Sequence, residues 1–331
     1  MRNLPALLAH ADWSTTPRKR WMAVAQLSGD TFELSAPQPV GETASLLSRL
    51  HRRAQGKPFI AGFDFPIGVP AAYAERAGIE FFLAELPKFG SGDWALFYEL
   101  AESAGEISLW RPFYPSRPGG TSQRALTDGL GVRSMRELLR VCERGEGRPN
   151  ACSLFWTLGG NQVGRAAISG WREVLAPALA QSVMRVTVWP FNGDLNLLLR
   201  TSACVIVETY PAEAGLHIGL DLPRRGWSKR RQSDRQRQGE RLRKWAAHRP
   251  QGRLSEELGR AIRDGFSAAA SGEDRFDAVV GLLSMIEVLL GYRSDGAAGS
   301  CAPLQVEGWI FGQTREAGGQ TQLTPSGPDG T

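Results

Sequence analysis

Residues 5–34 read PALLAHADWSTTPRKRWMAVAQLSGDTFEL, and this stretch decides the class of fold. Its apolar segments predict strands at 5–13, 20–29 and 30–37, with a hairpin turn at Gly29-Asp30. The next segment, 41–56, has apolar residues at helical spacing and ends in a glycine, which predicts an amphipathic helix. Residues 57–66, KPFIAGFDFP, predict a strand buried on both faces. The order of three strands, a helix and a strand indicates an α/β fold.

The rest of the chain predicts an interrupted core. We expect helices at the following positions: 71–86, 93–103, 134–143, 165–180, 254–271 and 273–290. An extra strand is predicted at 184–189 and a buried one at 201–210. We therefore divide the chain into three parts: a core made of two segments, 1–69 and 200–313, a mostly helical insertion at 70–199, and a disordered tail at 314–331. The insertion is expected to pack beside the functional site without extending the central sheet.

Composition excludes several classes of protein. The chain has 331 residues, of which 42% are apolar and 22% charged, and it contains no apolar run long enough to cross a membrane. The four cysteines and four histidines show no zinc-binding spacing. Residues 1–14 lack the pattern of a signal peptide, so we expect a cytoplasmic protein with no membrane partner. The oligomeric state is left open.

Carboxylates at the ends of apolar segments are the candidate functional residues. Asp12, Asp64 and Glu208 each lie near the end of a predicted strand, while Asp274 and Asp277 share one face of a helix start. A buried carboxylate needs a compensating partner, and several converging carboxylates suit Mg²⁺ or Mn²⁺. All five are predicted metal ligands, and all but Asp274 are predicted catalytic residues. The alternative is structural, with Asp12 forming a turn with Ser14 and Asp274 capping its helix.

A basic segment follows the Glu208 strand. Residues 223–249 contain eleven Lys or Arg and two acids, whereas the whole chain has a net charge of +5. We expect a helix from about Asp234, and binding of nucleic-acid phosphates by five cations: Lys229, Arg230, Arg237, Arg241 and Lys244. Trp227 and Trp245 are candidates for stacking on bases. The alternative is a solvated helix that binds nothing.

Five motifs give the chain a family resemblance: ADWS (11–14), GFDFPIG (62–68), ETYPA (208–212), RFDAVVGLL (275–283) and EGWIF (307–311). In this order they resemble the domain-of-unknown-function family numbered 429, whose members are predicted nucleases of the RNase H-like superfamily. The resemblance implies a three-layer α/β/α fold with a five-stranded mixed sheet in the order 3-2-1-4-5. It also implies two divalent metal ions held by Asp12, Asp64, Asp277 and Asp274, with a less certain role for Glu208.

The function expected from these features is metal-dependent hydrolysis of phosphodiester bonds in nucleic acid. Two metal ions about 4 Å apart can activate a water and stabilise the leaving 3′-oxygen. Two alternatives stay open: a nucleic-acid-binding module without catalysis, and a metal-dependent hydrolase of a small phosphorylated ligand. The sequence does not distinguish DNA from RNA.

Overall fold

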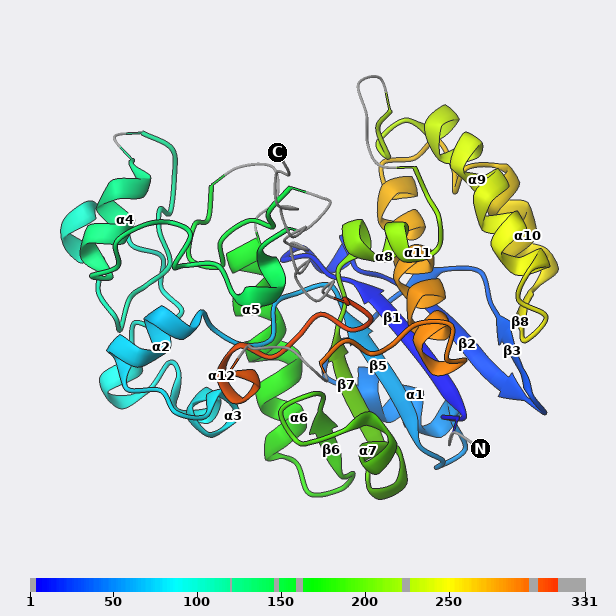
Figure 1. Cartoon of the computed structure of the whole chain (residues 1–331), viewed down its shortest axis with the longest axis horizontal. Helices are drawn as coiled ribbons and strands as arrows, with labels where there is room; N and C mark the ends of the chain where they lie inside the picture. Colours follow the sequence, from blue (N-terminus) through cyan, green and yellow to red (C-terminus); the bar gives the residue numbers. More distant parts are fainter. Residues whose placement is uncertain are drawn as a thin grey trace, which may run out of the picture.

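A mixed sheet forms the centre of the protein in the computed structural model, which describes residues 4–119, 121–145, 149–158, 163–221, 227–297 and 303–314. The strands run in the order β6-β7-β5-β1-β2-β3-β8, and β4 pairs with β2 beside this path. Their bounds are β1 Leu7–Asp12, β2 Trp21–Ser28, β3 Thr31–Leu34, β4 Gln38–Pro39, β5 Phe59–Phe63, β6 Val186–Val188, β7 Cys204–Glu208 and β8 Gly252–Leu254. The protein is therefore of the α/β class with parallel and antiparallel strands in one sheet (Figure 1).

The sheet corrects the expectation of five strands in the order 3-2-1-4-5, because it has eight strands in a different order. The short strands β4, β6 and β8 are the additions. β6 lies within the predicted insertion and pairs in parallel with β7, so the expectation that residues 70–199 would not extend the sheet was also wrong. The sequence does predict a strand at 184–189. An apolar pattern over so few residues does not show which strand it pairs with, and the edge of a sheet accepts a short strand wherever its backbone groups are free.

The hairpin and the first helix form where the sequence predicts them. β2 and β3 are antiparallel, with Ser28 opposite Thr31, and Gly29 adopts the positive φ of 59° that the turn requires. Helix α1 spans Leu46–Arg53 and buries Leu46 and Leu50.

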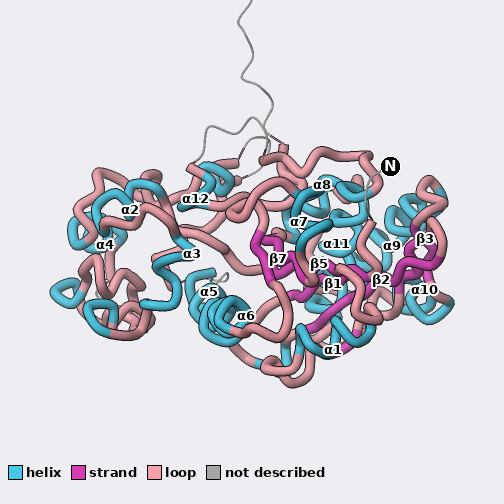
Figure 2. Tube along the Cα trace, turned by 90° about the horizontal axis from the view of Figure 1, so that it is seen from below, coloured by secondary structure: helices cyan, strands magenta, loops and turns pink. Residues whose placement is uncertain are grey.

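Helices cover both faces of the sheet. α1 packs on one face with Leu7, Ala9 and Met22. On the other face lie α8 (Pro211–His217) and the long α11 (Gly272–Leu289), which pack on residues from β1, β5 and β7. Figure 2 shows the strands between α1 on one side and α8 and α11 on the other. Alternate residues of each central strand therefore enter different cores.

Residues 71–180, most of the predicted insertion, form the part of the molecule beside β7 (Figure 1). Its helices are α2 Ala71–Ala77, α3 Phe82–Glu85, α4 Gln123–Gly129, α5 Val163–Gly170 and α6 Ala176–Ala180, and a π-helical turn at Trp171–Leu175 joins α5 to α6. The helices predicted at 93–103 and 134–143 do not form. Each segment instead holds successive turns, with a 3-10 turn at Gly92–Trp94 and another at Val141–Glu143.

The remaining helices are α7 Leu195–Thr201, α9 Gln232–Ala247, α10 Glu256–Arg263 and α12 Leu304–Glu307. α9 is the helix predicted in the basic segment, and it packs against α10 (Figure 1). Among the residues that the structure describes, no helix combines the length and apolar character needed to cross a membrane. All but the first residue of the predicted tail, 314–331, lie outside the described part.

Candidate functional site

Asp12 and Asp64 are neighbours at the ends of two parallel strands. Ala11 is paired with Phe63 in the β1–β5 register, and the Asp64 amide donates to the Ala11 carbonyl oxygen at 3.1 Å. Leu8 and Ile60 of the same strands belong to the core beneath α11. Since side chains alternate along a strand, Asp12 and Asp64 emerge on that same face.

The start of α11 brings two further acids to these strand ends. Asp274 and Asp277 lie in its first two turns. His10 holds the helix to β1, because its Nδ1–H donates to the Ala278 carbonyl oxygen at 2.9 Å while its Nε2 accepts from the Thr209 hydroxyl at 2.7 Å. The helix can approach this closely because residue 281 is glycine, where a Cβ would lie 2.2 Å from His10 Cε1.

Burial, together with neighbouring acids, raises the pKa values of all four aspartates. Burial and then Asp277 and Asp64 raise the pKa of Asp12 well above its ordinary value. Burial and Asp277 raise the pKa of Asp64 to about 7, and burial and Glu273 raise that of Asp274 to about 6. Burial also raises the pKa of Asp277, although the ammonium of Lys229 opposes this. We refer to Asp12, Asp64, Asp274 and Asp277 as the aspartate cluster.

Most of the cluster lacks partners. Within the described part of the chain, the carboxylates of Asp12, Asp64 and Asp274 make no hydrogen bond or ion pair with another side chain or with the backbone. Asp12 is only 9% exposed. The expected structural alternatives are therefore not seen, because Asp12 does not bond to Ser14 and Asp274 does not cap α11. A carboxylate that is desolvated without a partner is costly unless it is protonated or binds a cation.

Asp277 differs from the other three because it pairs with a cation. Lys229 Nζ forms an ion pair with Asp277 Oδ2 and lies 3.7 Å from Glu273 Oε1. Burial lowers the pKa of Lys229 and Asp277 raises it, and the net result is a pKa above the ordinary value. The sequence predicts that Lys229 binds nucleic-acid phosphates, but in the structure its ammonium lies against the aspartate cluster.

Glu208 lines the same cleft as Asp12 and Asp64 and its charge also raises the pKa of Asp64, but it emerges on the opposite face of the sheet. In the β5–β7 register it is paired with Phe63, whose side chain belongs to the core beneath α1. Arg140 forms a bidentate ion pair with it, at 2.7 Å from Nη1 to Oε2 and 2.5 Å from Nη2 to Oε1. The Ile67 amide also donates to Oε2, at 2.6 Å. Glu208 therefore has its charge balanced within the protein.

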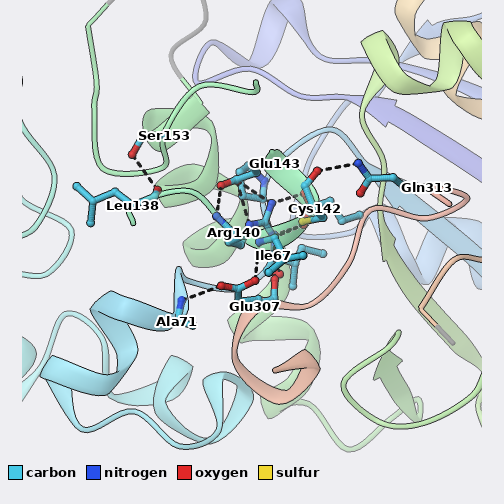
Figure 3. A network of polar contacts seen from close by, with 12 residues as sticks. Ile67, Ala71, Leu138, Arg140, Cys142, Glu143, Ser153, Glu307 and Gln313 are labelled. Carbon is cyan, nitrogen blue, oxygen red and sulfur yellow. Dashed lines mark hydrogen bonds and ion pairs between the residues drawn. The ribbon is translucent and has the colours of Figure 1, made fainter. Parts of the chain in front are cut away.

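Arg140 is fully buried and connects four segments of the chain (Figure 3). Besides Glu208 it bonds to the Glu143 carboxylate at 3.0 Å and to the carbonyl oxygens of Ile67 and Glu307, each at 3.0 Å. The Glu307 carboxylate in turn accepts from the amides of Val141 and Ala71, at 2.6 and 2.9 Å. This network fixes the insertion to the ends of β5 and β7.

A cleft of about 620 Å³ lies over these residues. The cluster members that line it are Asp12, Asp64 and Asp274, and Arg140, Glu143 and Val163 of the insertion form part of its wall. The insertion is thus beside the candidate site. Within the described ranges, no group of three or more His, Cys, Asp or Glu side chains is arranged to hold a metal ion. Lys229 engages Asp277, and Glu208 faces Arg140, which leaves Asp12 and Asp64 as an adjacent pair.

The other predicted nucleic-acid contacts lie in different surroundings. Arg230 lines the cleft, whereas Arg237 pairs with Asp234, and Arg241 pairs with Asp221 at 2.8 Å. Lys244 is exposed on α9. The stacking role proposed for Trp245 was wrong, because its ring is buried and its Nε1–H donates to Glu287 at 2.7 Å. Trp227 is half-buried.

Sequence reasoning missed two residues of this site. Lys19, in the 3-10 turn between β1 and β2, lines the cleft. Arg140 is one of many arginines in the chain, and nothing in its local pattern indicates burial. For Lys19, the motif ADWS places the following loop at the strand end that carries Asp12, and this was the one signal that could have found it.

The chain was compared with protein-family models, with curated proteins and with solved structures, and none of the three comparisons found a match.

Proposed function

We propose that the protein is a metal-dependent nuclease whose aspartate cluster holds Mg²⁺ or Mn²⁺. The observation that carries this proposal is Asp12, a buried carboxylate without a hydrogen bond or ion pair among the described residues, facing the cleft beside the equally unpartnered Asp64. A divalent cation bound by the two carboxylates would offset the cost of burying their charges side by side.

The donor set fits magnesium or manganese. Both ions prefer carboxylate oxygens, and Mg²⁺ is usually held by one or two carboxylates together with waters and substrate phosphates. Asp12 and Asp64 supply that minimum from adjacent strands. Asp277 and Asp274 add negative charge from α11, while the Arg140 pairing suits Glu208 to positioning the insertion better than to binding metal.

The arrangement of the central strands supports an RNase H-like core. β3, β2, β1, β5 and β7 are successive neighbours in the sheet once the short strands β4, β6 and β8 are set apart. The acids lie on β1, directly after β5, and on the helix α11, in agreement with the family resemblance of the sequence.

Cations beside the cleft support a phosphodiester substrate. Lys19 and Arg230 line it and are exposed, so their side chains can bind phosphate oxygens. Asp12 and Asp64 would hold the ion, and the packing of α11 on His10 keeps Asp277 next to them. A divalent ion supplies Lewis acidity and a water of lowered pKa.

Melting and cleavage assays on the full chain, with Mg²⁺ or Mn²⁺, test this function. The ion should raise the melting temperature of the wild type, and single-stranded, double-stranded or branched DNA or RNA should be cleaved. Asp12→Asn should lose cleavage and most of the metal-induced shift. Without metal it should be at least as stable as the wild type, because one of several repelling carboxylates is gone.

The exposed acid Asp128 of α4 provides a control, and Asp128→Asn should behave like the wild type. A wild-type protein whose melting temperature does not respond to either ion would contradict the proposed function.

The second candidate is a metal-dependent hydrolase of a small phosphorylated ligand. The shape of the cleft favours this candidate, because the insertion forms part of its wall and its volume is about 620 Å³. Competition decides between the two, since a nucleotide that displaces a bound oligonucleotide at equal concentration would favour the small ligand.

A further inference from the structure

Hydrogen bonds to the surrounding backbone hold Lys229 beside the aspartate cluster. The Asp234 carboxylate accepts from the Ser228 amide at 2.9 Å, and Arg235 Nη1 donates to the Lys229 carbonyl oxygen at 2.5 Å. Arg235 is 1% exposed and is itself held by the carbonyl oxygens of Gly265 and Ser267, at 2.8 and 2.6 Å. These contacts tie the backbone at Ser228 and Lys229 to α9, and the ammonium of the lysine lies against Asp277.

The Lys229 ammonium contacts Asp277 directly and acts on Asp12 and Asp64 from a greater distance, lowering the pKa of each. Asp277 has an ammonium on its Oδ2, with Glu273 Oε1 3.7 Å from the same nitrogen. Asp12, which is nine-tenths buried, and its neighbour Asp64 have no such partner in the described chain and face the cleft. A second metal ion at Asp277 would compete with the ammonium for this carboxylate and would be repelled by its positive charge.

We propose that the Lys229 ammonium is a resident cation of the aspartate cluster, so that the site takes one divalent ion at Asp12 and Asp64 instead of two. This inference rests on the proposed function. The lysine neutralises Asp277 and presents N–H donors to the same region, but an ammonium cannot coordinate a water as a metal ion does. Metal-bound water is therefore confined to the Asp12–Asp64 side of the cluster.

The number of bound ions tests this proposal. The full chain is titrated with Mn²⁺, free Mn²⁺ is measured by electron paramagnetic resonance, and calorimetry gives an independent stoichiometry. We expect one ion per wild-type chain. Lys229→Met removes the ammonium and keeps an unbranched side chain only one atom shorter, and it should bind two ions. Lys229→Arg retains a cation and should bind one.

Arg230→Met is the matched control, because it removes a positive charge from the next residue, whose Nε lies 3.7 Å from Glu273 Oε2. It should still bind one ion. Two ions in the wild type, or one in folded Lys229→Met, would overturn the resident-cation proposal and leave the proposed function in place. No ion bound by the wild type would overturn both. The wild-type count decides even if Lys229→Met does not fold.

Discussion

Asp64 is the residue whose ionisation should be easiest to follow in the metal-free protein. Burial and the neighbouring Asp277 raise its pKa from 3.8 to about 7. A group with a higher pKa in the folded chain contributes stability that is complete below its unfolded pKa and is lost as the pH rises through its folded pKa. The free energy of unfolding should therefore decrease from about pH 4 to pH 7 through this residue.

Urea denaturation across that pH range, with a chelator present, measures the effect. Asp64→Asn should show a smaller decrease than the wild type, whereas Asp30→Asn, at the exposed hairpin turn, should follow the wild type. Equal pH dependence in the wild type and Asp64→Asn would show that Asp64 is not desolvated beside another charge.

At this same scale, the sequence predicts part of the candidate site. Asp12, Asp64 and Asp277 come together as their positions at strand and helix ends suggest. The face of the sheet on which Glu208 lies could not be predicted, because the residues on both faces of β7 are apolar and buried. Only the pairing of Glu208 with Phe63 shows which way it points. Lys229 was equally hidden, since one cation in a basic run looks like its neighbours.

Among the elements, α11 depends on its closest contact with the sheet. Gly281→Ala would drive a methyl group into the His10 ring, so it should destabilise the protein by about 1–3 kcal/mol despite the higher helix propensity of alanine. Gly259→Ala in α10 is the control, because its Cβ would meet only the end of the Arg263 side chain, at 3.6 Å. That change should stabilise by up to about 1 kcal/mol. Denaturant midpoints of the two variants moving in the same direction would contradict this packing.

The insertion is held to the core elements by the Arg140 network. Arg140→Met leaves the buried Glu208 and Glu143 carboxylates without their cation and should cost about 3–5 kcal/mol. Arg133→Met breaks an exposed arginine–glutamate pair in the same region and should cost less than about 1 kcal/mol. Adding Glu208→Gln to Arg140→Met should recover part of the lost free energy of unfolding. Similar denaturant midpoints for the two single variants would show that the network contributes little.

The elements that sequence reasoning predicted wrongly have a physical explanation. In 93–103 the apolar residues Trp94, Phe97, Tyr98 and Ala101 have helical spacing, and all four are buried. Their backbone nevertheless forms turns, such as Phe97 N–H to the Trp94 carbonyl oxygen at 2.9 Å. A turn that repeats every three residues buries the same positions as a helix, so the pattern cannot separate them. In 134–143, the extended backbone of Arg140 interrupts any helix and directs its side chain to Glu208.

At the scale of the whole molecule, the cations considered for nucleic-acid binding lie in two places. Lys19, Lys229 and Arg230 line the cleft, whereas Arg237, Arg241 and Lys244 are carried by α9, which packs with α10 near β3 and β8 (Figure 1). On α9, three arginines are paired with acids: Arg237 with Asp234, Arg241 with Asp221 and Arg243 with Glu240. The net charge that α9 offers to a polyanion is therefore smaller than the sequence suggests.

The salt dependence of nucleic-acid binding should distinguish these two places. Removing one cation that binds a phosphate lowers the log–log slope of affinity against salt by about 0.7 to 0.9, because fewer counterions are released on binding. Lys19→Gln with Arg230→Gln should therefore lower the slope more than the triple change of Arg237, Arg241 and Lys244 to Gln, since two of the latter are already paired with acids. Fluorescence anisotropy with Ca²⁺ in place of Mg²⁺ measures binding without turnover. A parental slope in the cleft variant together with a reduced slope in the triple variant would place the nucleic acid along α9 and away from the aspartate cluster.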